Sequence, residues 1–433
     1  MTRTRRAPNH ARPVASVTSY DTQVRHADEL RRRGACDDAV RAFHAIAQSN
    51  PQRSDAFANL GAMLQAAGHP TQALHAITHA MELDPTNVSA LINSAEIMKD
   101  FGEWETVRDT YDAALSLQPH CATVRYARAL HLLTLGRWRD GWREHEQRWQ
   151  VPDLPLTTAR LTTPQWDGTP LNGQRILLDH EQGLGDQVMF ARFASGVAAR
   201  GGDVTLRCSA PLVPLFETLP GAATVVADGA PIPAHDVRAS LMSLPQLLGI
   251  NSPDLLQGAA YLRTVGECPP AVARVAAAKR AQVGLVWSGN PQHRNDARRS
   301  IAPRLLAPLL TASQVDFVSL QRHDGRATLA EPLRGAVRDL GGALHSFNDT
   351  AHALRQLDLL ITVDTSVAHL AGALGVKTLL LIPFVPDWRW MLGRTDTPWY
   401  RSVEIVRQQS LFEWAPVISL VRARLDTLCT VRE

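Results

Sequence analysis

Two patterns of apolar and polar positions divide the chain. In the first third, small or apolar residues recur in steps of 34 positions, at Ala39, Ala73 and Val107 and again at Ala80 and Ala114. From about residue 174 onward, apolar runs of five or six residues alternate with helical stretches. The first pattern predicts repeated helices, and the second predicts buried parallel strands that alternate with helices in doubly wound sheets.

Glycine and proline mark the boundaries of the repeated helices. Each residue type recurs every 34 positions. Glycine occurs at Gly34, Gly68, Gly102 and Gly136, and proline at Pro51, Pro85 and Pro119. Glycine permits a tight turn between two helices, and proline cannot continue the second helix. The spacing therefore predicts four helix pairs that begin near Tyr20, Ser54, Val88 and Ala122. This arrangement resembles the tetratricopeptide repeat, and its best copy lies at residues 59–85.

The fourth pair departs from the repeat pattern. Gly141 and His145 stand where the other copies carry a small and an aromatic residue, and residues 138–149 are rich in tryptophan. Because a terminal repeat must cap the stack or pack on something else, we expect this pair to dock on the domain that follows. His75 and His79 lie four residues apart in the second pair. They fit surface or groove histidines better than metal ligands, since no third ligand is nearby in the sequence.

Eight apolar runs are expected to form strands. They cover residues 175–179, 204–208, 224–227, 283–287, 317–320, 359–363, 378–382 and 403–406. A proline- and alanine-rich stretch at 261–281 separates the first three runs from the other five. We therefore expect two Rossmann-like lobes, at 174–265 and 282–433, with an inter-lobe linker at 266–281. The preceding segments are expected to be a disordered basic tail (1–19), the repeats (20–152) and a linker (153–173).

Composition and charge narrow the function classes. The chain has 433 residues, 45% of them apolar, and its net charge of +3 comes from 45 basic and 42 acidic residues. This balance gives no argument for a nucleic-acid partner. The five cysteines are far apart and form no C-x-x-C, the N-terminus lacks the apolar core of a signal peptide, and no apolar run is long enough to span a membrane. We therefore expect a cytoplasmic protein with reduced thiols, no zinc site and no membrane span.

The first candidate site is the glycine-rich turn after the first expected strand. Gly183 and Gly185 permit a tight turn and the close approach of a ligand, and Asp186 precedes an expected helix at 187–200. Asp186 has two interpretations. It is either a helix N-cap, which contributes about 1 kcal/mol, or a carboxylate at the carboxyl end of a strand, where open α/β sheets bind ligands.

The second candidate site follows the expected strand 359–363. Asp364 ends this strand, and Thr365 and Ser366 begin a helix of small residues, with His369 one turn further on. The exposed amides of such a helix start make an anion site. Each residue alone also has a structural explanation, Asp364 or Thr365 as a cap and His369 as an interior histidine. Together, at the end of a buried strand, they favour a ligand site.

These two turns, with residues 283–290 between them, resemble the bacterial heptosyltransferases of glycosyltransferase family nine from about residue 174 to the C-terminus. The resemblance implies the two-lobed GT-B fold and an inverting, metal-independent transfer of a sugar from a nucleotide-diphosphate sugar. It implies that Asp186 is the catalytic base, and that Arg299 stands near the family's loop lysine. The residues expected to bind the donor and its phosphates are Gly183, Gly185, Ser288, Asn290, Arg299, Asp364, Thr365, Ser366 and His369.

The order of repeats followed by lobes also resembles bacterial repeat-containing glycosyltransferases and, more remotely, the protein O-GlcNAc transferases. An inverting transfer needs a base for the acceptor hydroxyl and neutralisation of the leaving diphosphate. Asp186 would be the base, while the amides of residues 365–367, with Arg299 or Arg294, would neutralise the diphosphate. We therefore expect no metal and no cofactor apart from the nucleotide sugar as co-substrate, and a protein or glycan acceptor held by the repeats.

Three alternatives stay open. Asn290 and His293 are either donor contacts or parts of a solvated loop. The aromatic residues at 383–390, with Trp399 and Tyr400, either stack on a base or sugar or pack the C-terminal helix onto the second lobe. The first lobe, about 90 residues long, is short for an acceptor lobe. The competing function is therefore a non-catalytic repeat scaffold with a degenerate glycosyltransferase-like binding domain.

Overall fold

A computed structural model describes residues 19–152, 154, 156, 162–274, 280–293, 295–322, 329 and 331–430. Residues 1–18 of the expected basic tail and most of the stretch 153–161 in the expected linker thus lie outside the described residues, as does Arg294. The chain divides into two units, Met1–His120 and Cys121–Glu433, which we call the first and the second unit. Each is described by itself.

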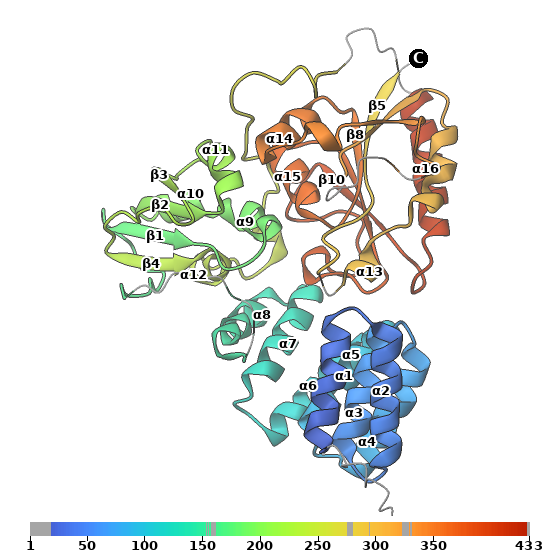
Figure 1. Cartoon of the computed structure of the whole chain (residues 1–433). Helices are drawn as coiled ribbons and strands as arrows, with labels where there is room; N and C mark the ends of the chain where they lie inside the picture. Colours follow the sequence, from blue (N-terminus) through green and yellow to red (C-terminus); the bar gives the residue numbers. More distant parts are fainter. Residues whose placement is uncertain are drawn as a thin grey trace, which may run out of the picture. The chain divides into compact units, whose positions relative to one another are not determined.

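The described part of the first unit, residues 19–120, contains three helix pairs that follow the predicted 34-residue period (Figure 1). Its helices are α1 (Tyr20–Arg32), α2 (Cys36–Ser49), α3 (Ser54–Ala66), α4 (Pro70–Leu83), α5 (Val88–Asp100) and α6 (Trp104–Leu117). The predicted starts at Tyr20, Ser54 and Val88 are confirmed. Within the second pair, a Cβ added to Gly61 would lie 3.3 Å from the carbonyl oxygen of Ala73, so glycine lets α3 and α4 approach closely.

The repeated glycines end the first helix of each pair. Gly34, Gly68, Gly102 and Gly136 have φ angles of +77°, +84°, +75° and +76°. Glycine adopts this left-handed conformation without the steric cost that other residues meet, so it ends the helix and turns the chain into the next one. The predicted helix turns are therefore confirmed at all four positions.

The second unit begins with the fourth helix pair, α7 (Ala122–Thr134) and α8 (Trp138–His145), and continues into the 3₁₀ helix η1 (Glu146–Gln150). Trp138 and Trp142 of α8 are buried in the same apolar core as Phe190 and Trp399. The ring of Trp138 stacks on that of Trp399 at 5.0 Å, and the ring of Trp142 meets that of Phe190 edge-on at 6.0 Å. The predicted docking of the fourth pair on the following domain is confirmed.

Two parallel sheets make up the rest of the second unit. The first sheet has the order β3-β2-β1-β4 and the second the order β10-β9-β8-β5-β6-β7. The strands of the first are β1 (Arg175–Asp179), β2 (Asp203–Cys208), β3 (Thr224–Ala227) and β4 (Val237–Ser240). Those of the second are β5 (Ala281–Val286), β6 (Val315–Ser319), β7 (Val337–Asp339), β8 (Leu359–Val363), β9 (Thr378–Ile382) and β10 (Val403–Arg407).

All eight predicted strands are present, and two further strands were not predicted. The additional strands, β4 and β7, lie at the edges of their sheets and contain Arg238, Arg338 and Asp339. Edge strands are short and often charged, so they give no continuous apolar run. By contrast, β8 is buried on both faces. Leu360 faces one apolar core and Ile361 the other, which explains its unbroken apolar sequence.

Helices cover the two sheets. They are α9 (Leu184–Ala191), α10 (Ala194–Ala198), α11 (Val213–Phe216), α12 (Leu244–Leu247), α13 (Asp296–Arg299), α14 (Phe347–Arg355), α15 (Ser366–Leu374) and α16 (Ala415–Thr430). The short 3₁₀ helices after η1 are η2 (Ala210–Leu212), η3 (Leu241–Ser243), η4 (Pro253–Leu255), η5 (Pro303–Thr311), η6 (Gly341–Ala343) and η7 (Trp388–Trp390). The second unit thus begins with the helical pair that completes the repeats and continues as an α/β fold.

The strand order identifies where each sheet would bind a ligand. When its strands are numbered in sequence order and counted from the β7 edge, the second sheet is arranged 3-2-1-4-5-6, with β5 and β8 at the centre. This is the order of the doubly wound dinucleotide-binding fold, in which ligands bind outside the carboxyl ends of the two central strands. The corresponding position in the first sheet lies between β1 and β4. Both candidate turns follow strands at these positions.

Candidate functional site

The glycine-rich turn after β1 begins a helix earlier than predicted. Gly183 is the N-cap of α9, so Asp186 is its third residue rather than its cap. The expected helix at 187–200 is in fact two helices, α9 and α10. The interpretation of Asp186 as an N-cap is therefore wrong, and its carboxylate projects from the first turn of α9.

The turn after β8 begins helix α15 as predicted. Thr365 is the N-cap, but its side chain makes no capping hydrogen bond, and its Oγ1 is buried without a partner among the described residues. Asp364 precedes the cap. Burial raises the pKa of Asp364 to about 6, the negative charge of Asp387 adds to this rise, and Arg299 opposes it. The start of α15 therefore has no side-chain cap.

The two predicted turns meet in the second unit. A Cβ added to Gly185 would lie 2.9 Å from Cδ2 of His369 and 3.5 Å from Cα of Ser366. Only glycine allows the first turn of α9 to come this close to the first turn of α15. This contact brings the two loops together, so that Asp186, after β1, and Asp364–Ser366, after β8, lie at the same junction.

Arg389 connects the two turns, and sequence analysis did not single it out. This residue of η7 is only 9% exposed. Its guanidinium pairs with Asp186, and its Nη1 lies 2.6 Å from Oδ1 of Asp387. Although burial acts to lower the pKa of Arg389, these two carboxylates raise it. An arginine inside a run of buried aromatic residues was the sequence signal that could have identified it.

His369 lies inside the protein, against the glycine turn. It is 4% exposed, its Nδ1 lies 3.0 Å from the hydroxyl of Tyr400, and its ring stacks on Trp390 at 5.2 Å. Burial lowers the pKa of His369 to about 3, and the charge of Arg389 contributes in the same direction. The imidazole is therefore neutral at pH 7.

Replacing His369 by glutamine should make the second unit less sensitive to acid. The unfolded chain takes up a proton below pH about 6.5, whereas folded His369 does so only near pH 3, so wild type loses stability as the pH falls through this range. At pH 5 the loss from this residue is about 2 kcal/mol. We expect Tm to fall less in the variant than in wild type between pH 7 and pH 5, measured by calorimetry. His345→Gln, an exposed control, should behave as wild type; an equal fall in His369→Gln would contradict the assignment.

The loop after β5 lies at the carboxyl end of a central strand of the second sheet. The backbone amide of Ser288 donates to Oε1 of Gln321 at 3.1 Å, and Arg299 pairs with Asp296 at 3.2 Å. The charge of Arg299 acts on Asp364, so these two residues lie within electrostatic reach. Asn290 is exposed, and its Oδ1 accepts from the amide of Gln292 at 3.0 Å, as in a solvated turn.

The tryptophans at 388, 390 and 399 and Tyr400 are buried, and neither of the two roles expected for them describes their position. Trp388, Trp390, Trp399 and Tyr400 belong to the core shared with α8 and α9. Helix α16 belongs to the other core, on the opposite face of the second sheet. These rings therefore pack the fourth helix pair and the first sheet's helices against the second sheet, and their buried faces are occupied by protein.

A buried ion pair holds the start of the glycine-rich turn. Arg148 of η1 lies 3.0 Å from Glu181, and both side chains are 0% exposed. Arg148 also donates to Oγ of Ser243 at 2.7 Å and pairs with Glu146 at 2.6 Å. Because Glu181 follows β1 and Ser243 follows β4, the guanidinium fills the position where the first sheet would bind a ligand.

A second charged group lies at the same edge of the first sheet. Arg207 of β2 pairs with Asp179, at the end of β1, and with Asp228, which follows β3. The Nε2 of His180 lies 2.8 Å from the same Asp228 carboxylate. These contacts tie the carboxyl ends of three strands together.

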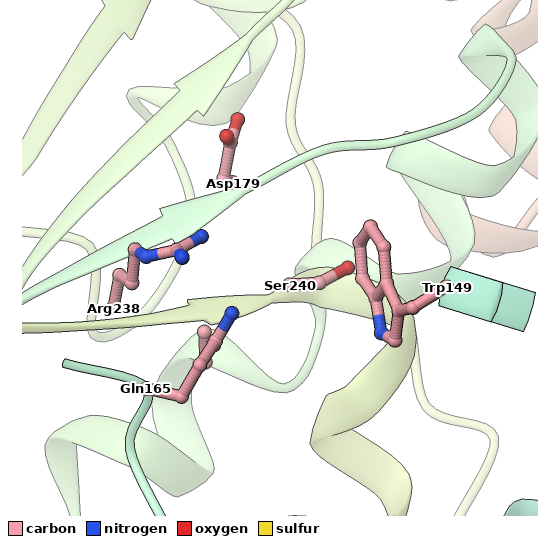
Figure 2. A pocket seen from close by; sticks show the side chains of 6 residues that line it. Trp149, Gln165, Asp179, Arg238 and Ser240 are labelled. Atoms are coloured by element: carbon pink, nitrogen blue, oxygen red, sulfur yellow. The ribbon is translucent and has the colours of Figure 1, made fainter. Parts of the chain in front are cut away.

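A small hollow opens beside these networks at the carboxyl ends of β1 and β4. Figure 2 shows the ring of Trp149 near Ser240, with Asp179 on β1, Arg238 on β4, and Gln165 on the neighbouring segment that bridges to Arg238. The hollow is small and partly open to solvent. None of the predicted site residues lines it. The candidate site is therefore the junction of α9, α15 and η7.

The described residues offer neither a clustered metal site nor a membrane-spanning helix. Within the described ranges, no three His, Cys, Asp or Glu residues are grouped as a metal site would require. His79 lies 3.3 Å from Glu82 on an exposed helix face. No helix in the part of the chain that the structure describes is long and apolar enough to cross a bilayer. The cytoplasmic location expected from the sequence stays a prediction.

The fold and the site define a class. The chain is a tetratricopeptide-like helical-repeat protein whose second unit carries two parallel α/β sheets. No family model matches it. Over 428 residues it is 27% identical to protein FlbA of Caulobacter vibrioides, a match that covers 92% of this chain and 71% of that protein.

A second relative matches only in part. Over 113 residues the chain is 31% identical to the probable UDP-N-acetylglucosamine–peptide N-acetylglucosaminyltransferase SPINDLY of Hordeum vulgare. The match covers 26% of this chain and 12% of that protein, and it lies in a repeat region. The similarity therefore concerns the repeats and not the two sheets.

Solved structures of repeat proteins are also similar to part of the chain. A MamA protein is 20% identical, covering 30% of this chain and 70% of its own, with a TM-score of 0.25. The thermophilic repeat protein TTC0263 of Thermus thermophilus is 16% identical, covering 32% and 77%, with a TM-score of 0.29.

Proposed function

We propose that the protein is a metal-independent, inverting glycosyltransferase that uses a nucleotide-diphosphate sugar. The observation that carries the proposal is the meeting of Gly185 with His369 and Ser366, which brings one acidic loop from each sheet to one place. Paired lobes of the GT-B type act in this way, with the acceptor on one lobe and the donor on the other. The heptosyltransferase-like sequence of both loops supports the same assignment.

The donor would bind at the carboxyl ends of β5 and β8. The amides of Thr365 and Ser366 would hold the diphosphate, because the start of α15 is uncapped and carries the positive end of the helix dipole. Asp364 would accept hydrogen bonds from donor hydroxyl groups. Ser288 lies on the neighbouring loop after β5. Arg299, at the end of α13, lies within electrostatic reach of Asp364.

Asp186 would be the general base. Its carboxylate would take the proton of the acceptor hydroxyl while the acceptor oxygen attacks the anomeric carbon from the face opposite the diphosphate. The bond from the anomeric carbon to the diphosphate oxygen breaks, and the diphosphate leaves with the electron pair. Gly183 and Gly185 would allow the backbone to approach the substrates.

The repeats would bind the acceptor protein or glycan, or a partner that delivers it. The repeat-region similarity to SPINDLY, whose name describes a probable peptide glycosyltransferase, supports a protein acceptor. The second candidate function is a scaffold that binds a nucleotide sugar without turnover. It is favoured by one observation, the pairing of Asp186 with Arg389, which occupies the carboxylate of the proposed base.

Donor binding tests the proposal. A set of nucleotide-diphosphate sugars, screened by thermal shift, should contain at least one that raises Tm, since a ligand at 100 times its Kd stabilises the fold by about 2.7 kcal/mol. With that donor, Asp364→Ala and Arg299→Ala should weaken binding while the unliganded Tm stays near that of wild type. Asp396→Asn, an exposed control in the second unit, should bind as wild type. Unchanged affinity in both site variants would place the donor elsewhere, and no donor at all would refute the proposed function.

A further inference from the structure

The guanidinium of Arg389 is a charged group at the junction of α9, α15 and η7. None of the roles proposed in the previous subsection involves it. It belongs to η7, which follows β9 at the carboxyl edge of the second sheet. Its Nη2 pairs with Asp186, its Nη1 pairs with Asp387, and it also acts electrostatically on Asp364. Asp186 reaches it from the first sheet's loop, so Arg389 contacts both sides of the junction.

A buried arginine at this place needs anionic partners. Removing a cation from water is costly unless carboxylates or phosphates surround it. Here Asp186 and Asp387 supply those charges, but Nε of Arg389 is buried with no hydrogen-bond partner among the described residues. One donor of the guanidinium therefore remains for a further acceptor at the site.

The surroundings of Arg389 already provide the other elements of an anion site. His369, on the first turn of α15, lies within electrostatic reach of Arg389, and the uncapped helix start precedes it. Arg299 is less available, since its guanidinium is paired with Asp296 and packs over Gly289. Arginine matches phosphate oxygens with two parallel hydrogen bonds, which lysine does not provide.

We propose that Arg389 is the residue that binds the diphosphate of the donor, and that Asp186 holds the place of that diphosphate when no donor is bound. This inference rests on the proposed function. A diphosphate at the start of α15 would take over Nη2 of Arg389 from Asp186. The freed carboxylate could then accept the proton of the acceptor hydroxyl. Donor binding would thus precede activation of the base, and the two substrates would act in a fixed order.

The competition gives opposite effects for two substitutions, measured by calorimetric titration with nucleoside diphosphates and with the donor sugar. Arg389→Gln should weaken binding by about tenfold or more, because it removes the charge-assisted hydrogen bonds. Asp186→Asn should tighten binding by about three- to tenfold, because it removes the competing carboxylate. Asp396→Asn, which removes an exposed carboxylate from Arg394, should leave binding unchanged.

Arg389→Lys is the second variant, which keeps the test valid if Arg389→Gln does not fold. It keeps the charge but not the fork of donors, so its affinity should lie between those of wild type and Arg389→Gln at equal Tm. Wild-type affinity in Asp186→Asn would overturn the competition, and wild-type affinity in Arg389→Gln would overturn the role of Arg389. Either result would leave the proposed function standing. Failure of wild type to bind any nucleoside diphosphate or donor sugar would refute both.

Discussion

Asp186→Asn should lower glycosyl transfer by roughly 10²–10⁴-fold, the range expected for loss of a general base. Asparagine has nearly the shape of aspartate, so the first turn of α9 and the close contact of Gly185 with His369 are retained. The amide cannot accept a proton from the acceptor hydroxyl. Turnover of the donor identified by thermal shift is the measurement, with Tm recorded for each variant.

The result separates the base from a purely structural carboxylate. Asp186 is 19% exposed and its pairing with Arg389 is one interaction in a larger charged group, so a structural role alone predicts a change in Tm and little change in turnover. The matched control is Asp396→Asn, which removes a carboxylate from an arginine on the surface of the same unit. Wild-type turnover by Asp186→Asn would show that Asp186 is not the general base, whereas no turnover by wild type itself would favour the scaffold function.

Much of the fold could be predicted because the chain repeats its signals. Gly34, Gly68 and Gly102 each occupy a left-handed position that ends a helix, so their spacing alone indicated the helix pairs. Strands such as β8 are buried on both faces and therefore show as unbroken apolar runs. The edge strands β4 and β7 escaped prediction because they are short and interrupted by charged residues at the margin of a sheet.

The candidate site could be predicted only where it is local in sequence. The two turns, Gly183–Asp186 and Asp364–His369, each follow an apolar run that predicts a strand. In the first turn this run is followed by glycines and an acidic residue, and in the second by an acidic residue and hydroxyl side chains. The contact of Asp186 with Arg389 joins residues 203 positions apart, and no local motif encodes it. The sequence left two roles open for the aromatic residues around Arg389, ligand stacking or packing of the C-terminal helix, but their rings fill the core between α8, α9 and the second sheet. A run of aromatic residues does not distinguish an open cleft from a filled one.

The fourth helix pair has a consequence for the first sheet that its sequence did not reveal. At the position between β1 and β4 where such a sheet binds ligands, the side chain of Arg148 enters from η1 and contacts Glu181 and Ser243. The side chain of Arg148 thus connects the segment after α8 to the start of the glycine-rich turn that carries Asp186. We expect this contact to support both the stability of the second unit and the position of the turn.

Arg148→Met should therefore destabilise the second unit by about 3–5 kcal/mol, because it leaves the carboxylate of Glu181 buried without its cation. Burial already raises the pKa of Glu181 in the presence of Arg148. The measurement is the Tm and the denaturant midpoint of the second unit. Arg143→Met is the matched control, since Arg143 belongs to α8, is 65% exposed and pairs with Asp140; it should cost at most about 1 kcal/mol.

The double variant Arg148→Met/Glu181→Met tests whether the penalty comes from the uncompensated charge. Replacing both members of a buried pair by apolar residues of similar volume is often neutral or stabilising, so most of the lost stability should return. Turnover in the double variant should nevertheless be lower than in wild type, because the hydrogen bonds between Arg148 and the start of the glycine-rich turn are gone. Recovery of stability together with wild-type turnover would show that Arg148 stabilises the fold without positioning the turn. Failure to recover stability would instead assign the cost to lost packing around Arg148.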